Sequence, residues 1–312
     1  MVGKPTIGTA GRGVRPTVRC AFGAPYTLSD SSSLRRIFRY WLPMFGTWMI
    51  MAVEAPFVAA VIARMADPKH NLAAFGVAYA VAILVEAPVI MILSASTALV
   101  RGKVSFDRLL RFTWALNLVL TAAMLLLVLT PLWSLIASRL IGLPERVVEL
   151  SRVGLLLMTL WPAAIGYRRF YQGLLIRSGR TRRVAWGTVV RLVTMGGTSL
   201  TLLATSDLPG VWVGTAGIGL GVVAEAVASR IMARHEVLQT THDLTEKSPP
   251  GYAEIASFYW PLALTSIISL AVHPLVTFFM GRARFPLESL AVLPVVNSLA
   301  FVFRSPGLAY QE

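Results

Sequence analysis

The chain has 312 residues, of which 55% are hydrophobic and only 14% are charged, and its mean hydropathy is +0.66. A soluble domain carries about 25% charged residues, so this composition excludes an ordinary soluble protein and favours one that spans a membrane. The net charge of +14 would suit a nucleic-acid-binding protein, an interpretation that depends on where the cations lie. The single cysteine, Cys20, excludes a disulfide framework and a cysteine-based metal site.

Residues 1–33 are polar, basic and rich in Gly and Pro, with no acidic residue before Asp30. This composition predicts a disordered tail on the cytosolic side of the membrane. An organelle transit peptide has a similar composition and is the alternative. No apolar core of a secretory signal peptide is present in this stretch.

Apolar runs long enough to cross a bilayer recur along nearly the whole chain. They predict an all-α integral membrane protein with about eight transmembrane helices. In chain order, the predicted helices cover 40–64, 72–99, 108–130, 150–175, 184–205, 210–233, 254–280 and 288–310, with a short interfacial stretch at 132–140. Prolines within apolar runs predict kinks at Pro56, Pro88, Pro162, Pro274 and Pro306.

The distribution of basic residues predicts the orientation. With the N-terminus inside, twenty Lys and Arg lie on the tail and inner loops, seven lie on outer loops, and Arg191 and Arg304 lie within helices. This bias follows the positive-inside rule. Topology therefore explains the charge and excludes the nucleic-acid interpretation, and the pattern predicts a multi-pass protein of the plasma or inner membrane with a cytosolic N-terminus.

The helical hairpin at 38–100 repeats 218 residues further along the chain, which is the difference between positions 43 and 261. Four prolines coincide with four prolines: Pro43, Pro56, Pro68 and Pro88 correspond to Pro261, Pro274, Pro286 and Pro306. Six helices per repeat is an even number, so the two copies should cross the membrane in the same direction, related by an axis along the membrane normal. The predicted organisation is a tail (1–33), a complete six-helix lobe (34–234), a cytosolic linker (235–251) and the first two helices of an incomplete second lobe (252–312).

Four segments carry a more specific resemblance. FGVAYAVAILVEAP (75–88) and SFYWPLAL (257–264), with the pairing of the hairpins, resemble the progressive-ankylosis (Ank) family of the multidrug/oligosaccharidyl-lipid/polysaccharide (MOP) flippase superfamily. RRFYQGLLIRSGRTRRVAWGTVVR (168–191) resembles the link between the fourth and fifth helices of that superfamily, and GVWVGTAGIGLG (210–221) resembles its sixth helix.

The resemblance implies a fold like that of the related multidrug-and-toxin extruders (MATE), with two six-helix lobes around a central cavity lined by helices 1, 2, 7 and 8. It also implies export by alternating access, and vertebrate Ank proteins are associated with efflux of pyrophosphate, nucleotides or citrate. This chain departs from the pattern because helices 9 to 12 are missing, which puts independent transport in question.

Ionisable residues inside the bilayer are candidates for function, because each costs about 2.5–3.5 kcal/mol at mid-membrane. Glu54 and Glu86 are either groups that couple transport to a proton or cation, or carboxylates hydrogen-bonded at a nearby proline kink. His273 is either a coupling group or a satisfied structural histidine. The full set of candidates for substrate binding or ion coupling is Glu54, Glu86, Asn117, Arg191, His273, Asn297 and Arg304.

Alternatives stay open for several of these residues. Arg191 either attracts an anionic substrate or extends back to the interface, and the two asparagines could simply bond between helices. Glu225 is interpreted as structural, with a partner near Arg230, and the basic residues between 168 and 183 as facing lipid headgroups. The GxxxG spacings in 210–221 predict close helix packing.

Glu86 and Arg304 occupy equivalent positions in the two copies of the repeat. This equivalence predicts that they form an ion pair across the central cleft when the inner side is closed. The alternative is that each finds a partner within its own lobe.

No enzyme signature is present, because the four histidines lack metal-ligand spacing and no Walker motif occurs. We therefore expect no catalytic residue, metal or cofactor. The predicted function is secondary active export, by alternating access, of a small solute, anionic ones included, or of a lipid-linked molecule. The expected partners are the bilayer, the substrate and a coupling proton or cation, and no nucleic acid. The alternative is a transport-inactive membrane fragment or a subunit that needs a second chain to complete its second lobe; a membrane transferase acting on lipid-linked substrates is a third hypothesis.

Overall fold

The computed structural model describes residues 17–19, 25–27, 32–242, 246 and 248–311. The chain divides into two compact units, 1–42 and 43–312. In the first unit, β1 (Thr17–Arg19) pairs antiparallel with β2 (Pro25–Thr27). This short hairpin departs from the prediction of a wholly disordered tail, and most of that predicted tail lies outside the described residues.

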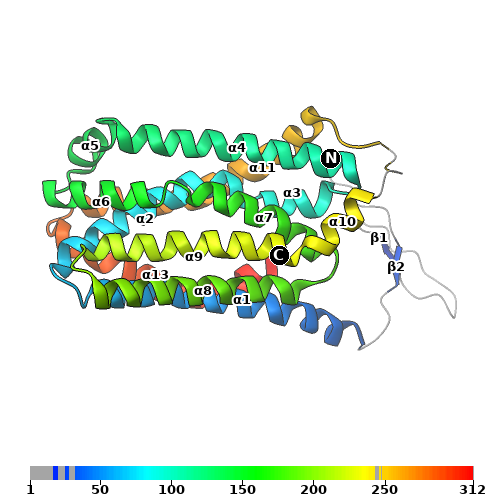
Figure 1. Cartoon of the computed structure of the whole chain (residues 1–312), viewed down its shortest axis with the longest axis horizontal. Helices are drawn as coiled ribbons and strands as arrows, with labels where there is room; N and C mark the ends of the chain where they lie inside the picture. Colours follow the sequence, from blue (N-terminus) through cyan, green and yellow to red (C-terminus); the bar gives the residue numbers. More distant parts are fainter. Residues whose placement is uncertain (1–16, 20–24, 28–31, 243–245, 247, 312) are drawn as a thin grey trace. The chain divides into compact units, whose positions relative to one another are not determined.

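The second unit consists of helices that run side by side, with α5 at one end and α10 at the other (Figure 1). Within the described residues, eight spans are long and apolar enough to cross a membrane. This confirms the prediction of an all-α, multi-pass membrane protein. The helices are α1 (Ser32–Ile62), α2 (Pro68–Ile90), α3 (Ile92–Leu99), α4 (Lys103–Leu129), α5 (Leu132–Ser134), the π-helix η1 (Leu135–Ile141), α6 (Glu145–Leu157), α7 (Trp161–Arg177), α8 (Thr181–Thr205), α9 (Gly210–Met232), α10 (Arg234–His242), α11 (Tyr252–Leu270), α12 (Val272–Gly281) and α13 (Pro286–Gln311).

Helix α2 is the element around which the second unit packs. Its sequence is apolar on all sides, which is typical of a helix buried all round. It contacts α6, α7 and α9 of the first six spans, and also α11, α12 and α13 of the last two. The segment 252–312 therefore packs on the earlier helices through α2, within one compact unit.

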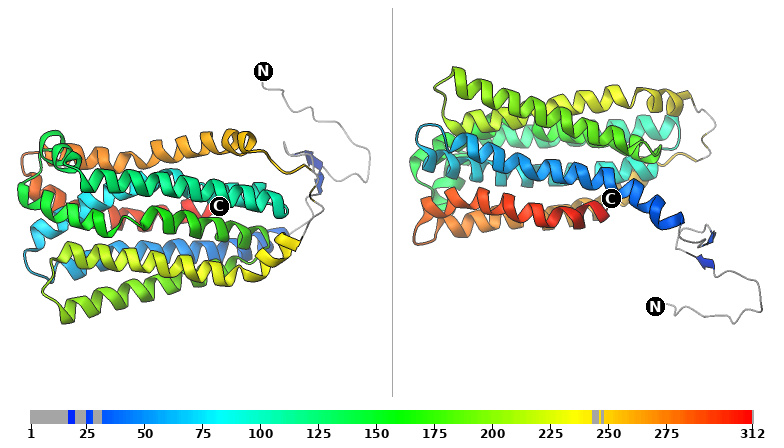
Figure 2. Two further views of the ribbon diagram at one scale, coloured as in Figure 1. Left: turned by 45° about the horizontal axis from the view of Figure 1, so that its top comes forward. Right: turned by 90° about the horizontal axis from the view of Figure 1, so that it is seen from below.

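The contact between α2 and α13 joins equivalent positions of the sequence repeat. Gly76 lies so close to α13 that a Cβ atom there would be 2.6 Å from Cγ of Pro294 and 3.4 Å from the carbonyl oxygen of Leu290. Positions 76 and 294 differ by 218 residues, the offset of the repeat. A twofold axis between two equivalent helices requires such self-contact of equivalent residues. Helix α13 also contacts α1. The ring centroids of Trp48 on α1 and Phe301 on α13 are 5.9 Å apart, and Figure 2 shows α1 and α13 beside one another.

Helix interruptions fall near three of the five prolines that were expected to kink their helices. Breaks separate α2 from α3 at Met91, α6 from α7 just before Pro162, and α11 from α12 at Ala271, three residues before Pro274. The Tyr259 hydroxyl of α11 donates a hydrogen bond to the Pro88 carbonyl, so a side chain enters the backbone ladder near the first break.

Helices α1 and α13 continue without interruption through Pro56 and Pro306. The breaks therefore do not occupy equivalent positions in the two hairpins, contrary to what a strict repeat would give. A proline weakens the helix locally, and the asymmetry indicates that tertiary contacts decide whether the helix opens there.

The predicted cytosolic linker, 235–251, is helical in its first half. Glu236 of α10 is buried and forms ion pairs with Arg180 at 2.7 Å and with Arg183 at 3.4 Å. Both arginines lie at the start of α8. Further along, Glu246 accepts a hydrogen bond from the backbone N–H of Ser105 at 3.0 Å, near the start of α4. These contacts tie the linker to the ends of two spans.

Candidate functional site

Six ionisable side chains gather inside the helical bundle, and we call them the charge cluster. They come from α1, α2, α7, α8 and α9, and they comprise three carboxylates and three guanidinium groups, so their formal charges balance. At 1.5 Å per residue, those on α7, α8 and α9 lie roughly 10–15 Å in from the helix end nearest to α10. The members of the charge cluster are Glu54, Glu86, Arg168, Arg169, Arg191 and Glu225.

Glu225 of α9 is the centre of the charge cluster and is 1% exposed. One carboxylate oxygen forms an ion pair with Arg168 of α7 and lies 3.7 Å from Nη1 of Arg191. The other oxygen accepts hydrogen bonds from Nε2 of Gln172 at 3.1 Å and from the Thr188 hydroxyl at 3.3 Å. Glu225 therefore joins α9 to both α7 and α8.

Arg191 of α8 bridges two carboxylates on different helices. Its Nη2 atom forms an ion pair with Glu54 of α1, and Nη1 faces Glu225. The bridge depends on close packing of α8 and α9, because a Cβ atom at Gly221 would lie 3.0 Å from the Arg191 carbonyl oxygen. This contact confirms the close helix packing that the GxxxG spacing predicts. The same packing places Arg191 beside Glu225.

Such a cluster is costly to bury and is held together by its own pairing. Removing charges from water costs several kcal/mol per ion, which mutual attraction offsets only when geometry and hydrogen bonding are good. Four buried polar atoms of the charge cluster lack a hydrogen-bond partner among the described residues, namely Oε1 of Glu54, Oε2 of Glu86, Nε of Arg168 and Nε of Arg191. The cluster therefore retains unused donor and acceptor capacity that points to a function beyond packing.

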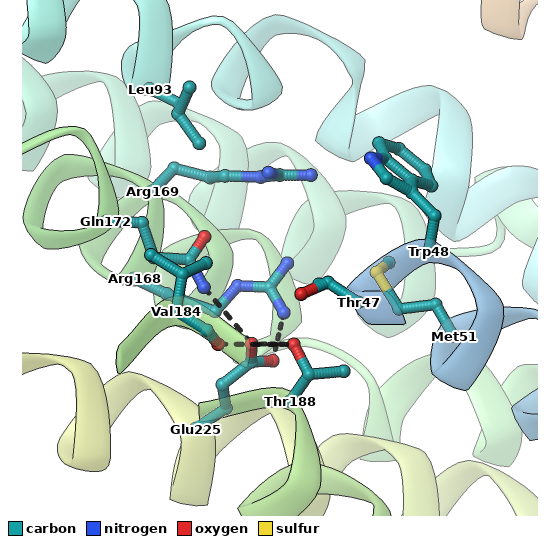
Figure 3. A pocket seen from close by; sticks show the side chains of 10 residues that line it. All are labelled: Thr47, Trp48, Met51, Leu93, Arg168, Arg169, Gln172, Val184, Thr188 and Glu225. Atoms are coloured by element: carbon teal, nitrogen blue, oxygen red, sulfur yellow. Dashed lines mark hydrogen bonds and ion pairs between the residues drawn. The ribbon is translucent and has the colours of Figure 1, made fainter. Parts of the chain in front are cut away.

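A small pocket opens onto the charge cluster between α1, α3, α7 and α8. Figure 3 shows the guanidinium groups of Arg168 and Arg169 directed toward Thr47 and Trp48 of α1, with Glu225 below them. Its cavity volume is about 10 Å³, enough for roughly one water molecule. In this conformation the pocket is closed to any larger solute.

Glu86 of α2 lies beside the three arginines of the charge cluster and does not pair with Arg304. It is half-buried and within electrostatic range of Arg168, Arg169 and Arg191. The ion pairs among the described residues do not join Glu86 to Arg304, and the Arg304 side chain is exposed. The predicted pair across the cleft is therefore wrong for this conformation, because the first lobe itself supplies the cations around Glu86.

The remaining candidates lie outside the charge cluster. His273 of α12 is half-buried and within electrostatic range of Arg304, and Asn297 is exposed on α13. Asn117 of α4 is buried and donates a hydrogen bond to the Ala163 carbonyl of α7 at 3.1 Å, so it connects two helices. The structure thus brings together Glu54, Glu86 and Arg191 from the candidate set.

Two interpretations of the sequence need correction. Arg168 and Arg169 are 3% and 9% exposed and do not face headgroups, which lowers the inner count of cations from twenty to eighteen. Glu225 has its partners on α7 and α8 and not near Arg230. The i,i+4 spacing of Arg168 and Gln172, which places both on one face of α7, was the available signal for a polar site.

Among the described residues, no group of three or more His, Cys, Asp or Glu side chains could hold a metal ion. Comparisons with family models, with curated protein sequences and with solved structures find no match to this chain. The site must therefore be interpreted from its own geometry.

Proposed function

We propose that this multi-pass membrane protein is a secondary transporter that moves a small anionic solute by alternating access. The observation that carries the proposal is the charge cluster, a balanced set of six charges between five helices, of which five are buried and Glu86 is half-buried. Ionisable groups at this depth are rare and mark substrate or ion pathways.

The chemistry of the pocket favours an anion over a cation. Both oxygens of Glu225 are already engaged, by Arg168 on one side and by Gln172 and Thr188 on the other. The Nε donor of Arg168 is buried and has no hydrogen-bond partner among the residues that the structure describes. A carboxylate or phosphate group entering between α1 and α7 would therefore meet free donor capacity, and guanidinium groups recognise both.

The way in which Arg191 is shared supports the proposal of alternating access. It connects α1 through Glu54 and α9 through Glu225. If α1 moves away, Arg191 keeps a carboxylate partner on α9, and only the Glu54 carboxylate is left to be neutralised by a coupling proton or cation. The closed pocket described above is then one of two states, and Glu54 or Glu86 is the candidate group for a coupling proton or cation.

The resemblance to Ank-like MOP flippases is part of this proposal. It is supported by the order of the spans and by the self-contact of the repeat at Gly76 and Pro294. The same proposal places the N-terminus in the cytosol and the protein in a plasma or inner membrane, which the excess of inner cations supports.

The test is solute flux into proteoliposomes that contain the purified full chain. We expect uptake of an anion from a panel of citrate, pyrophosphate and ATP, and no uptake of the membrane-impermeant cation choline. Arg168→Gln should reduce that uptake at least about tenfold, since a lost charge-assisted bond is worth about 1.5–3 kcal/mol. The matched control is Arg111→Gln, an exposed arginine on α4, which should transport normally.

A folded chain that moves no anion, or an Arg168→Gln variant that transports normally, would contradict the proposal.

A second candidate, a subunit that needs another chain, is favoured by one observation: Asn297 and Arg304 are exposed on α13 within a membrane span or at its edge. Polar groups there are costly against lipid and are normally covered by protein. The flux assay separates the two, because the subunit alone would be folded and inactive.

A further inference from the structure

The structure contains a second concave feature, a groove between the end of α4 and the π-helix η1. We call it the η1 groove. Its volume is about 640 Å³, and it is shallow and wide open to its surroundings, a shape that suits a ligand held partly in the bilayer. It lies where one membrane span ends at Leu129 and the next begins at Glu145. The lining includes Leu126, Pro131, Leu132, Leu135, Ser138 and Arg139.

The wall formed by α5 and η1 is fixed by contacts on its other side. Trp133 is buried, and its indole N–H donates to the Val148 carbonyl of α6 at 3.2 Å. Arg282 donates to the Leu140 carbonyl at 2.7 Å, and a Cβ atom at Gly281 would lie 3.0 Å from the Ile141 carbonyl oxygen. The groove is therefore preformed, which reduces the entropy lost when a ligand binds.

The lining has an apolar side and a single charge. Leu126, Leu132 and Leu135 are all exposed in the groove. The Ser138 hydroxyl donates a hydrogen bond to the carbonyl of Ser134, the last residue of α5, at 2.5 Å. Arg139, the one charged residue of the lining, makes no hydrogen bond or ion pair with any residue that the structure describes.

We propose that the η1 groove binds an anionic glycerophospholipid, with its phosphate on Arg139 and an acyl chain along the leucines. The groove opens at the end of two spans, where lipid headgroups meet the hydrocarbon region. A hydrocarbon chain alone would leave Arg139 unpaired, and a free phosphate would leave the leucines uncovered. The proposal requires only that the chain spans a membrane, and it is independent of transport.

The test is native mass spectrometry of the purified full chain, titrated with phosphatidylglycerol, phosphatidylcholine or glycerol 3-phosphate. We expect phosphatidylglycerol to bind most tightly and glycerol 3-phosphate not to bind. Arg139→Gln should lower the affinity for phosphatidylglycerol about fivefold, which corresponds to the contribution of one basic residue near a lipid surface. Arg146→Gln is the matched control, because Arg146 is an exposed arginine on α6, the next helix along the chain, and does not line the groove.

A second variant tests the apolar side. Leu135→Trp fills the groove from an exposed position. It should lower the affinity for both phospholipids and leave the thermal unfolding temperature unchanged. Equal binding of phosphatidylglycerol to the wild type and to Arg139→Gln would overturn the proposal. Equal binding of the two phospholipids would also overturn it, since that is the behaviour of lipid without headgroup preference, and binding of glycerol 3-phosphate would indicate an anion site in its place.

Discussion

Replacing Glu225 with Gln is expected to lower the free energy of unfolding by about 3–5 kcal/mol, because removal of one partner leaves buried positive charge without compensation. Arg168 loses its ion pair, and Arg191 keeps only Glu54. Thermal unfolding of the purified chain in detergent measures the loss. The change is isosteric, so a large loss reports charge and not volume.

The matched control is Glu149→Gln on α6. Glu149 is exposed, and its carboxylate lies 3.9 Å from Arg146. An exposed pair of this kind is worth at most about 1 kcal/mol. Similar losses in the two variants would mean that the charge cluster is solvated and that Glu225 does not hold the three helices together.

Replacing Gly173 with Leu is expected to destabilise the protein by roughly 1–3 kcal/mol, the usual cost of overpacking. A Cβ atom at this position would lie 2.7 Å from the Leu93 carbonyl oxygen and 2.7 Å from Cβ of Ser96. Backbone of α3 would have to shift, and with it the wall of the pocket that Leu93 lines. Thermal unfolding again gives the magnitude.

Gly197→Ala on α8 serves as the comparison for the glycine substitution. Apart from its own helix backbone, no atom of the described residues lies within 4 Å of the added Cβ there, and the residue is helical. Alanine should therefore stabilise the helix by about 0.5–1 kcal/mol. If Gly173→Leu proved as harmless as Gly197→Ala, the close contact of α3 with α7 would be wrong.

The eight spans could be predicted from sequence because their signal is local. A run such as 210–233 is apolar and of membrane length, and its ends are marked by Pro209 and Arg230 or Arg234. The structure places this span at Gly210–Met232. The helix interruptions cannot be predicted in the same way. Pro56 and Pro274 occupy equivalent positions of the repeat, but α1 continues through Pro56, whereas a break separates α11 from α12 near Pro274.

The site could be predicted only in part, because pairing between helices depends on how each helix is rotated. Glu54, Glu86 and Arg191 stood out as charges within apolar runs. Arg168 lies next to a loop rich in arginine, and the composition of the segment 168–183 is typical of one that faces lipid headgroups. Its pairing with Glu225 on a helix 57 residues away has no local signature. The same reasoning explains why Glu86 was assigned a partner on the distant α13.

The most direct test of the account is the double variant Arg168→Met with Glu225→Leu, assayed for anion flux in proteoliposomes beside the wild type. The two substitutions remove a complete ion pair and leave Arg191 with Glu54, so the protein should fold about as stably as the wild type. The account predicts a folded protein whose anion flux falls at least about tenfold. Flux at the wild-type rate in this folded variant would contradict the claim that the charge cluster is the site of transport.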